Sequence, residues 1–382
     1  MENFIAYNPT KLHFGKGVVD QLHKSLPAYG SKALFIYGKG SVMRYGYYDL
    51  VLEELKKAKI KIVEYKGIKP NPVLDDVKKA SDLARNEKVD FIVALGGGSV
   101  IDTAKVVALA AVNNADIWDI MNYKAKADKA LPLISILTLA ATGTEMNGAA
   151  VIQNTKTDEK IGFFHPLIFP KESFLDPEFT FSVPKNHTAY GLVDLIAHSL
   201  EAFFAHGDAT LSDKMIGAIV QEAMYYGPLV LAEPKSYKYR AKIMWAATCA
   251  LNGTTSHARK SSGDWAVHGI GHSISYIYDT PHGATLSIAY PAWLKFHESK
   301  IEKRISQLGK ILFNENNITA EKTIRKLEDF FKSIDCPTRL KELGFIEYDK
   351  NKILSNMIKT NVSGMNYKLT HDDLTHIAEL MY

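Results

Sequence analysis

Hydrophobic patterning changes character near the middle of the 382-residue chain, and this change limits the folds open to it. Up to about residue 180, short runs of β-branched and aromatic residues alternate with segments of helical period. The runs predict buried strands at 33–37, 61–65, 91–95 and 133–137, and the segments between them predict helices at 48–59 and 73–86. Strands that alternate with helices favour a parallel sheet with helices on both faces.

The second half of the chain has a different pattern. Four prolines punctuate the stretch 166–184, which has little regular pattern. Beyond it the strand signal nearly disappears, and long helix-period segments follow at 189–205, 213–226 and 241–251. We therefore predict a Rossmann-like α/β domain over residues 1–184 and an all-α domain over 185–382, with a cleft between them.

Composition excludes several classes of partner. The net charge is only +4 and no run of five like charges occurs, so nucleic acid is not favoured. Two cysteines are too few for a disulfide framework, a cysteine zinc site or an iron–sulfur cluster. The most apolar stretches, 100–112 and 131–141, are too short to span a bilayer, and the N-terminus shows no targeting pattern. These features predict a cytoplasmic protein with no membrane partner.

A glycine-rich turn follows the third predicted strand. The strand at 91–95 leads into Gly96-Gly97-Gly98-Ser99, and a helix-like run begins at once. Glycines let a backbone approach a phosphate closely, and free N–H groups at a helix N-terminus attract the anion. The spacing differs from the usual dinucleotide fingerprint, because Ile101 stands where the third glycine belongs. The turn is either a phosphate cradle or a strand-to-helix connection that tolerates glycine.

A second polar loop, at 138–145, follows the next predicted strand. Open α/β sheets bind their ligands at this end of the strands. The loop contains Thr138, Thr142 and Gly143, which suit contacts to a diphosphate or a nicotinamide. Threonines that only cap the loop are the alternative.

Histidines are concentrated in the helical half, with five of the 13 between residues 257 and 297. His268 and His272 are spaced i,i+4 on one predicted helix, and His282 follows in Pro281-His282-Gly283. Asp194 and His198 share the same spacing on a helix that is apolar nearly all round. One aspartate with two or three histidines could bind a divalent first-row metal. The alternative is a buried histidine–aspartate hydrogen bond with a structural role.

Taken together, these motifs identify the chain as resembling the iron-containing, or group III, alcohol dehydrogenases. The run from Gly96 to Lys105 resembles the cofactor signature of that family, and Asp194-x3-His198 with His268-x3-His272-x9-His282 resembles its metal motif. The likeness extends from Phe14 to the last helices. The most similar branch is the NADPH-dependent butanol dehydrogenases and aldehyde reductases.

The resemblance implies a dehydroquinate synthase-like, dinucleotide-binding N-terminal domain and a helical metal-binding domain. By position, the metal ligands would be Asp194, His198, His268 and His282. His272 would lie near the metal, the nicotinamide and the substrate oxygen, where it could relay a proton. The cofactor residues would include Asn71, Gly97, Gly98, Ser99, Asp102, Thr138, Thr142, Asn147 and Lys160. The metal would be Fe²⁺ or Zn²⁺, and the enzyme a homodimer.

The implied reaction interconverts primary alcohols and aldehydes with NADP(H), the metal acting as a Lewis acid on the oxygen. A polyol dehydrogenase of the same superfamily is the first alternative. A related lyase would need a basic cluster near Asp194 or His268, and none is evident. A metal hydrolase would not need the Gly96 turn, and a binding protein without activity would not need the full set of candidate ligands. The physiological substrate and the preferred direction are not given by the sequence.

The turn after the first predicted strand bears on the choice of cofactor. In the implied fold this strand ends beside the adenosine ribose, where an acidic residue would select NAD. Here the turn reads Gly38-Lys39-Gly40-Ser41, and the first acidic residue is Asp49. Lys39 and Ser41 could hold the ribose phosphate of NADP(H), and the alternative is a solvated surface lysine. We therefore predict a preference for NADPH.

Overall fold

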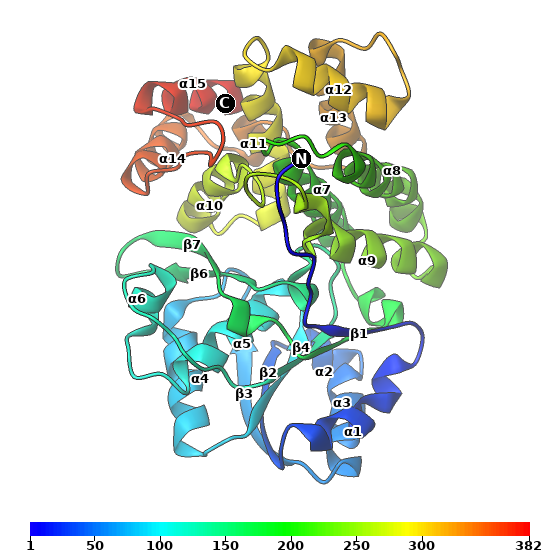
Figure 1. Ribbon diagram of the computed structural model, residues 1–382, viewed down its shortest axis with the longest axis vertical. Helices are drawn as coiled ribbons and strands as arrows, with labels where there is room; N and C mark the ends of the chain where they lie inside the picture. The colour runs from blue at the N-terminus through cyan, green and yellow to red at the C-terminus, as the bar shows by residue number, and fades with distance from the viewer. The chain divides into compact units, whose positions relative to one another are not determined.

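The computed structural model describes residues 1–382, which divide into two compact units (Figure 1). The α/β unit comprises Tyr7–Val183 and Lys235–Met244. The helical unit comprises Met1–Ala6, Pro184–Pro234 and Trp245–Tyr382. The break at 183/184 lies one residue from the boundary expected from the sequence, but the two short segments Met1–Ala6 and Lys235–Met244 belong to the unit opposite to the expected one.

A six-stranded parallel sheet forms the centre of the α/β unit, in the order β1-β8-β5-β4-β2-β3. Its strands are β1 (Lys11–Phe14), β2 (Lys32–Gly38), β3 (Lys61–Ile68), β4 (Phe91–Gly96), β5 (Leu133–Leu137) and β8 (Glu172–Leu175). A separate antiparallel pair consists of β6 (Ala149–Asn154) and β7 (Glu159–Phe164). The predicted fold class, a parallel α/β unit followed by a helical unit, is confirmed.

Helices cover both faces of the sheet, as the alternation of the strands requires. Leu34 and Ile36 of β2 pack into one core with α4 and α5, whereas Phe35 and Tyr37 face a second core with α1 and α3. The helices of this unit are α1 (Leu22–Ser25), α2 (Ser41–Arg44), α3 (Tyr47–Lys57), α4 (Leu74–Asn86), α5 (Gly98–Ala110) and α6 (Ile117–Met121). Both cores are fully buried, so the sheet is a rigid platform for the loops at its carboxyl edge.

The register of the sheet brings three candidate loops to one edge. Tyr37 of β2 pairs with Leu95 of β4, and Gly96 of β4 pairs with Leu137 of β5. The turns that follow these three strands therefore leave the sheet side by side.

Strand β8 lies in the stretch that the sequence pattern indicated to be irregular, and β1 was not predicted either. The four residues of β8 are buried between β5 and β1. Its first residue, Glu172, is a buried carboxylate that accepts hydrogen bonds from Ser25 Oγ (2.8 Å) and Tyr29 Oη (2.9 Å). An acidic residue in so short a run gives no strand signal, because its burial depends on partners far away in the chain.

The helical unit contains α7 (Lys185–Phe203), α8 (Thr210–Ala232), α10 (Ala266–Tyr278), α11 (His282–His297), α12 (Glu302–Phe313), α13 (Ala320–Ser333), α14 (Glu347–Lys359) and α15 (His371–Met381). Helix α9 (Tyr237–Leu251) begins in the α/β unit and ends in the helical unit.

Helix α8 is long and apolar enough to cross a membrane by length and composition alone, with a mean hydropathy of 1.2. Its buried residues recur every three or four positions, for example Ile216, Val220 and Ala223. Its Asp213 pairs with the guanidinium groups of Arg259 and Arg304. This pattern is typical of a helix packed on one side against its neighbours, so its length and hydropathy are weak grounds for a membrane span.

Candidate functional site

Helix α7 carries the first pair of candidate metal ligands. It is buried along most of its length, and Asp194 and His198 are only 3% and 5% exposed. The i,i+4 spacing places His198 Nδ1 3.5 Å from Asp194 Oδ1. Burial, together with the neighbouring His268, holds the pKa of His198 well below its usual value. The imidazole is therefore neutral and keeps a lone pair for a metal.

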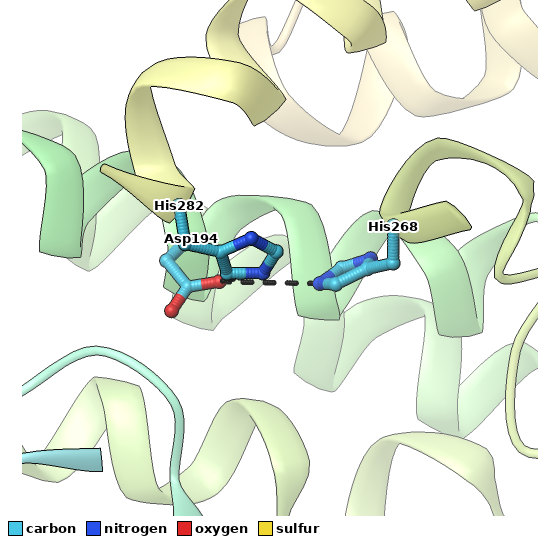
Figure 2. A group of neighbouring side chains, drawn as sticks. All are labelled: Asp194, His268 and His282. Atoms are coloured by element: carbon cyan, nitrogen blue, oxygen red, sulfur yellow. Dashed lines mark ion pairs between the residues drawn. The ribbon is translucent and has the colours of Figure 1, made fainter. Parts of the chain in front are cut away.

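Helices α10 and α11 bring two more imidazoles to the same carboxylate. Asp194 Oδ1 lies 3.9 Å from His268 Nε2 and 3.7 Å from His282 Nε2. Figure 2 shows the three side chains pointing toward one another from α7, α10 and α11. One ligand atom from each of the three lies within 4.8 Å of the other two. Residues separated by up to 88 positions thus form one nitrogen- and oxygen-rich cluster.

The donor set of this cluster fits a divalent first-row metal. Burial lowers the pKa of His268 to about 3, so its ring is neutral. His268 Nε2 and His198 Nδ1 are buried and have no hydrogen-bond partner within the protein, which is costly unless a cation binds there. Ligands about 2.0–2.2 Å from a tetrahedral metal lie roughly 3.3 Å apart. The separations of 3.5–3.9 Å from Asp194 Oδ1 are slightly wider than that.

His198 and His272 occupy different positions around the cluster. His198 stacks on His268, with ring centroids 4.6 Å apart, but it is outside the group of three whose ligand atoms are mutually close. The ring of His272 lies one turn beyond His268, 5.3 Å from the ring of His282, and is also outside that group. The assignments of His198 as a ligand and of His272 as a catalytic residue stay predictions.

Glu201 was missed by sequence reasoning, although it is in direct contact with the cluster. Burial raises the pKa of its carboxyl group to about 8, and Oε1 lies within hydrogen-bond distance (2.8 Å) of His268 Nδ1. Asp194, His198 and Glu201 are spaced i, i+4 and i+7, which places all three on one face of α7. This spacing is the signal that could have identified it.

The glycine turn of the α/β unit connects β4 to α5, as predicted. Helix α5 begins at Gly98, directly after Gly97. A Cβ atom at Gly98 would lie 2.9 Å from the Thr142 side chain, and one at Gly96 would lie 2.5 Å from Val100. Glycine is therefore required for packing at these positions, and the turn lies directly against the Thr142 loop. The Val100 N–H donates to the Gly97 carbonyl (3.0 Å), and the N–H groups that precede it are the ones that a helix N-terminus offers to a phosphate.

The predicted cofactor residue Asp102 lies below this loop, inside the unit. Its Oδ1 accepts a hydrogen bond from Thr144 Oγ1 (2.6 Å) and its Oδ2 accepts one from the Val151 N–H (2.9 Å). Burial raises the pKa of Asp102, and the nearby Lys105 opposes that shift. Both oxygens of Asp102 thus accept hydrogen bonds from within the α/β unit, and these bonds stabilise the loop between β5 and β6. A direct contact of Asp102 with the cofactor stays a prediction.

Lys105 completes this buried network. Its Nζ is fully buried and donates to Thr144 Oγ1 (2.7 Å), Asn147 Oδ1 (3.0 Å) and the Ala149 carbonyl (2.7 Å). Burial lowers the pKa of Lys105 to about 7, and Asp102 opposes that shift. The network ties the loop between β5 and β6 to helix α5. Asn147, another predicted cofactor residue, is thus part of the loop's support.

The remaining predicted cofactor residues belong to the same unit. Lys160 Nζ donates to Asn71 Oδ1 (2.6 Å), and both residues are 8% exposed. The Thr138 N–H donates to the Gly96 carbonyl (3.0 Å), which joins the two candidate loops. Lys39 and Ser41 are exposed: Lys39 follows the end of β2 at Gly38, and Ser41 is the first residue of the short helix α2.

Comparisons with known proteins agree with this architecture. A family profile described as iron-containing alcohol dehydrogenase matches residues 9–177, and one described as Fe-containing alcohol dehydrogenase family, C-terminal, matches residues 188–382. The probable NADH-dependent butanol dehydrogenase 1 of Bacillus subtilis (strain 168) is 39% identical over 386 residues, which is 99% of this chain and 99% of the relative. The NADPH-dependent aldehyde reductase YqhD of Escherichia coli (strain K12) is 34% identical over 383 residues, 98% of this chain and 97% of the relative.

A solved structure gives the same result. The NADH-dependent butanol dehydrogenase A of Thermotoga maritima superimposes with a TM-score of 0.96 at 39% identity, covering 100% of this chain and 99% of its own. A parallel α/β unit with a glycine turn, joined to a helical unit with an aspartate–histidine cluster, defines an alcohol/aldehyde oxidoreductase. The chain belongs to the iron-containing alcohol dehydrogenase family, and the resemblance drawn from its motifs is confirmed.

Proposed function

We propose that this enzyme uses NADP(H) and one divalent metal, Fe²⁺ or Zn²⁺, to interconvert primary alcohols of the butanol type and their aldehydes. The observation that carries the proposal is the buried group of Asp194, His268 and His282. The relatives named butanol dehydrogenase and aldehyde reductase support the substrate class.

The residues proposed to bind the metal belong to the helical unit, and those proposed to bind the cofactor belong to the α/β unit. Asp194, His198, His268 and His282 would hold the metal, which supplies a Lewis acid for an alcohol or carbonyl oxygen. His272, one turn beyond His268, would exchange a proton with that oxygen. In the α/β unit, Gly97, Gly98 and Ser99 would bind the pyrophosphate at the N-terminus of α5. Thr138, Thr142, Asn71 and Lys160 would complete the cofactor site.

The experiment that tests the function measures NADPH oxidation with butanal before and after removal of metal by a chelator. Turnover should require metal and should return when Fe²⁺ or Zn²⁺ is added to the stripped protein. Elemental analysis of the protein purified without added metal identifies the ion. Faster turnover of glycerol than of butanol would favour the polyol alternative, and metal-independent turnover would contradict the proposal. The homodimer and the cytoplasmic location stay predictions.

The cofactor preference is the first mutational test. Lys39→Asp replaces a cation with an anion in the turn after β2, so we expect NADPH binding to weaken by tenfold or more while NADH binding changes little. A charge-assisted hydrogen bond contributes about 1.5–3 kcal/mol, which corresponds to that factor. The measurement is kcat/KM with each cofactor in the wild type and the variant.

Lys129→Asp is the matched control, because the same charge change then falls in the exposed segment before β5, at the amino end of the sheet. NADH is the second candidate cofactor, since the Bacillus subtilis relative is named NADH-dependent. Equal efficiency with both cofactors in the wild type, or an unchanged preference in Lys39→Asp, would remove the case for NADPH.

A further inference from the structure

Glu201 is a buried carboxylate without a lysine or arginine partner. It is 1% exposed, and its only ion-pair contact is with the His268 ring. A charge in such a place is costly unless hydrogen bonds compensate it. The compensation comes from the start of α10: the Trp265 N–H donates to Oε2 (2.5 Å) and the His268 N–H donates to Oε1 (3.1 Å). The positive end of the helix dipole adds to this effect.

The same carboxyl group also contacts the side chain of His268. Glu201 Oε1 also faces His268 Nδ1 at 2.8 Å. An ionised Glu201 can only accept at this contact, so the ring hydrogen of a neutral His268 would be on Nδ1. A neutral imidazole then has its lone pair on Nε2, the atom that faces Asp194 Oδ1 at 3.9 Å.

Glu201 also holds the residue that starts α10. Trp265 has a left-handed backbone conformation, with φ of 67°, which is unfavourable for a bulky side chain. In this conformation the Trp265 ring meets the His268 ring edge-on, with centroids 5.2 Å apart, and lies 6.2 Å from the His198 ring. One carboxylate therefore fixes both the orientation of His268 and the aromatic group packed against the two imidazoles.

We propose that Glu201 is a positioning residue of the metal site, one that acts on the metal through His268. This role rests on the proposed metal-dependent function. Carboxylates that accept the second N–H of a ligating histidine orient the ring and raise its basicity, and their loss typically weakens metal affinity or activity about 10–100-fold. If the carboxylate had only a structural role, its loss would lower the stability of the protein and leave its metal affinity unaltered.

Two variants test the role. Glu201→Gln keeps the shape but replaces one acceptor oxygen with an NH₂ group, which must then face the N–H of either Trp265 or His268. Glu201→Ala removes all three contacts. We expect the metal affinity of the stripped protein, measured by competition with a chelator, to fall about 10–100-fold in Glu201→Gln and further in Glu201→Ala. The visible absorption of the Co²⁺-loaded protein should change in both.

Glu328→Gln is the matched control, because Glu328 is a buried carboxylate of the same unit that pairs with Lys295, Lys332 and Arg339 instead of a histidine. It should lose stability but keep its metal affinity within about twofold, below the range expected for a group that supports a ligand. NADPH binding and thermal unfolding report whether each variant is folded. If Glu201→Ala does not fold, the comparison of Glu201→Gln with the wild type decides the test.

Wild-type affinity in folded Glu201→Gln, or an equal loss in Glu328→Gln, would overturn the positioning role while leaving the proposed function intact. A wild-type protein that binds no divalent metal would overturn the proposed function and this role with it.

Discussion

Asp194→Ala is expected to bind no metal and to lose kcat/KM on the order of 1000-fold, because a Lewis acid contributes several kcal/mol to such a reaction. Asp194 Oδ1 lies within 4 Å of a nitrogen of each of the three histidines assigned as ligands. Without it, three imidazoles remain as candidate ligands and no carboxylate is among the candidate ligands. Metal content and steady-state kinetics of the purified variant provide the measurement. NADPH affinity should survive, since the cofactor loops belong to the α/β unit.

Two further variants make this result specific. Asp208→Ala changes an exposed aspartate of the same unit and should leave metal and activity intact. His272→Ala should keep the metal and lose activity, as expected for a residue that acts on the substrate oxygen and not as a ligand. Wild-type activity of Asp194→Ala in metal-free buffer would disprove the metal mechanism. If His272→Ala lost its metal, His272 would be a ligand and its assigned role wrong.

The strands that could be predicted are the ones that carry their own signal. β2, β4 and β5 are runs of mostly apolar, buried side chains, and their observed bounds match the predicted ones to within one residue. β8 begins with a glutamate two residues after Pro170 and has only four residues, so its place in the sheet depends on tertiary contacts alone. The sequence therefore defined the fold class and the central strands, but not the strands toward the β1 edge.

Local spacing predicted the pairs of site residues, whereas contacts between helices could not be predicted. The i,i+4 pairs on α7 and α10 follow from helix geometry. The orientation of the His268 ring, by contrast, depends on Glu201, whose buried carboxyl group contacts His268 Nδ1 from α7. The i+7 spacing of Glu201 on α7 could be recognised from the sequence, but its contacts with the start of α10 could not.

The cofactor signature also predicted which residues belong together, but not what each of them does. The match to the family motif led to Asp102 as a cofactor residue, whereas Lys105 of the same motif was given no role. The structure places both in the interior, where Asp102 and Lys105 share the Thr144 hydroxyl. A sequence motif records which residues are needed together, but it does not distinguish contact with a ligand from support of the loop that contacts it.

Lys105→Met should be strongly destabilising, by about 3–5 kcal/mol, since it removes the buried cation that offsets the Asp102 charge and leaves three buried acceptors without their donor. Methionine has a similar length, but it cannot donate to Asn147 Oδ1 or to the Ala149 carbonyl. Burial raises the pKa of Asp102 even with Lys105 present, and loss of the lysine should raise it further. The measurement is the free energy of unfolding of the α/β unit in urea.

The stability loss in Lys105→Met should also depend on pH, in a direction that follows from the raised pKa of Asp102. A carboxyl whose pKa is higher in the folded state than in the unfolded state binds its proton more tightly when folded, so stability falls as the pH rises through the folded pKa. The deficit in the free energy of unfolding of Lys105→Met relative to the wild type should therefore be larger at about pH 8 than at about pH 5.

A double variant tests the same charges. Adding Asp102→Asn to Lys105→Met should recover part of the lost stability, because the buried charge is removed and the asparagine can donate to Thr144 and accept from the Val151 N–H. Lys79→Met, on the exposed side of α4, is the control and should change little. A double variant less stable than Lys105→Met at about pH 8, or a deficit that grows on acidification, would show that the buried charges of Asp102 and Lys105 do not hold this loop.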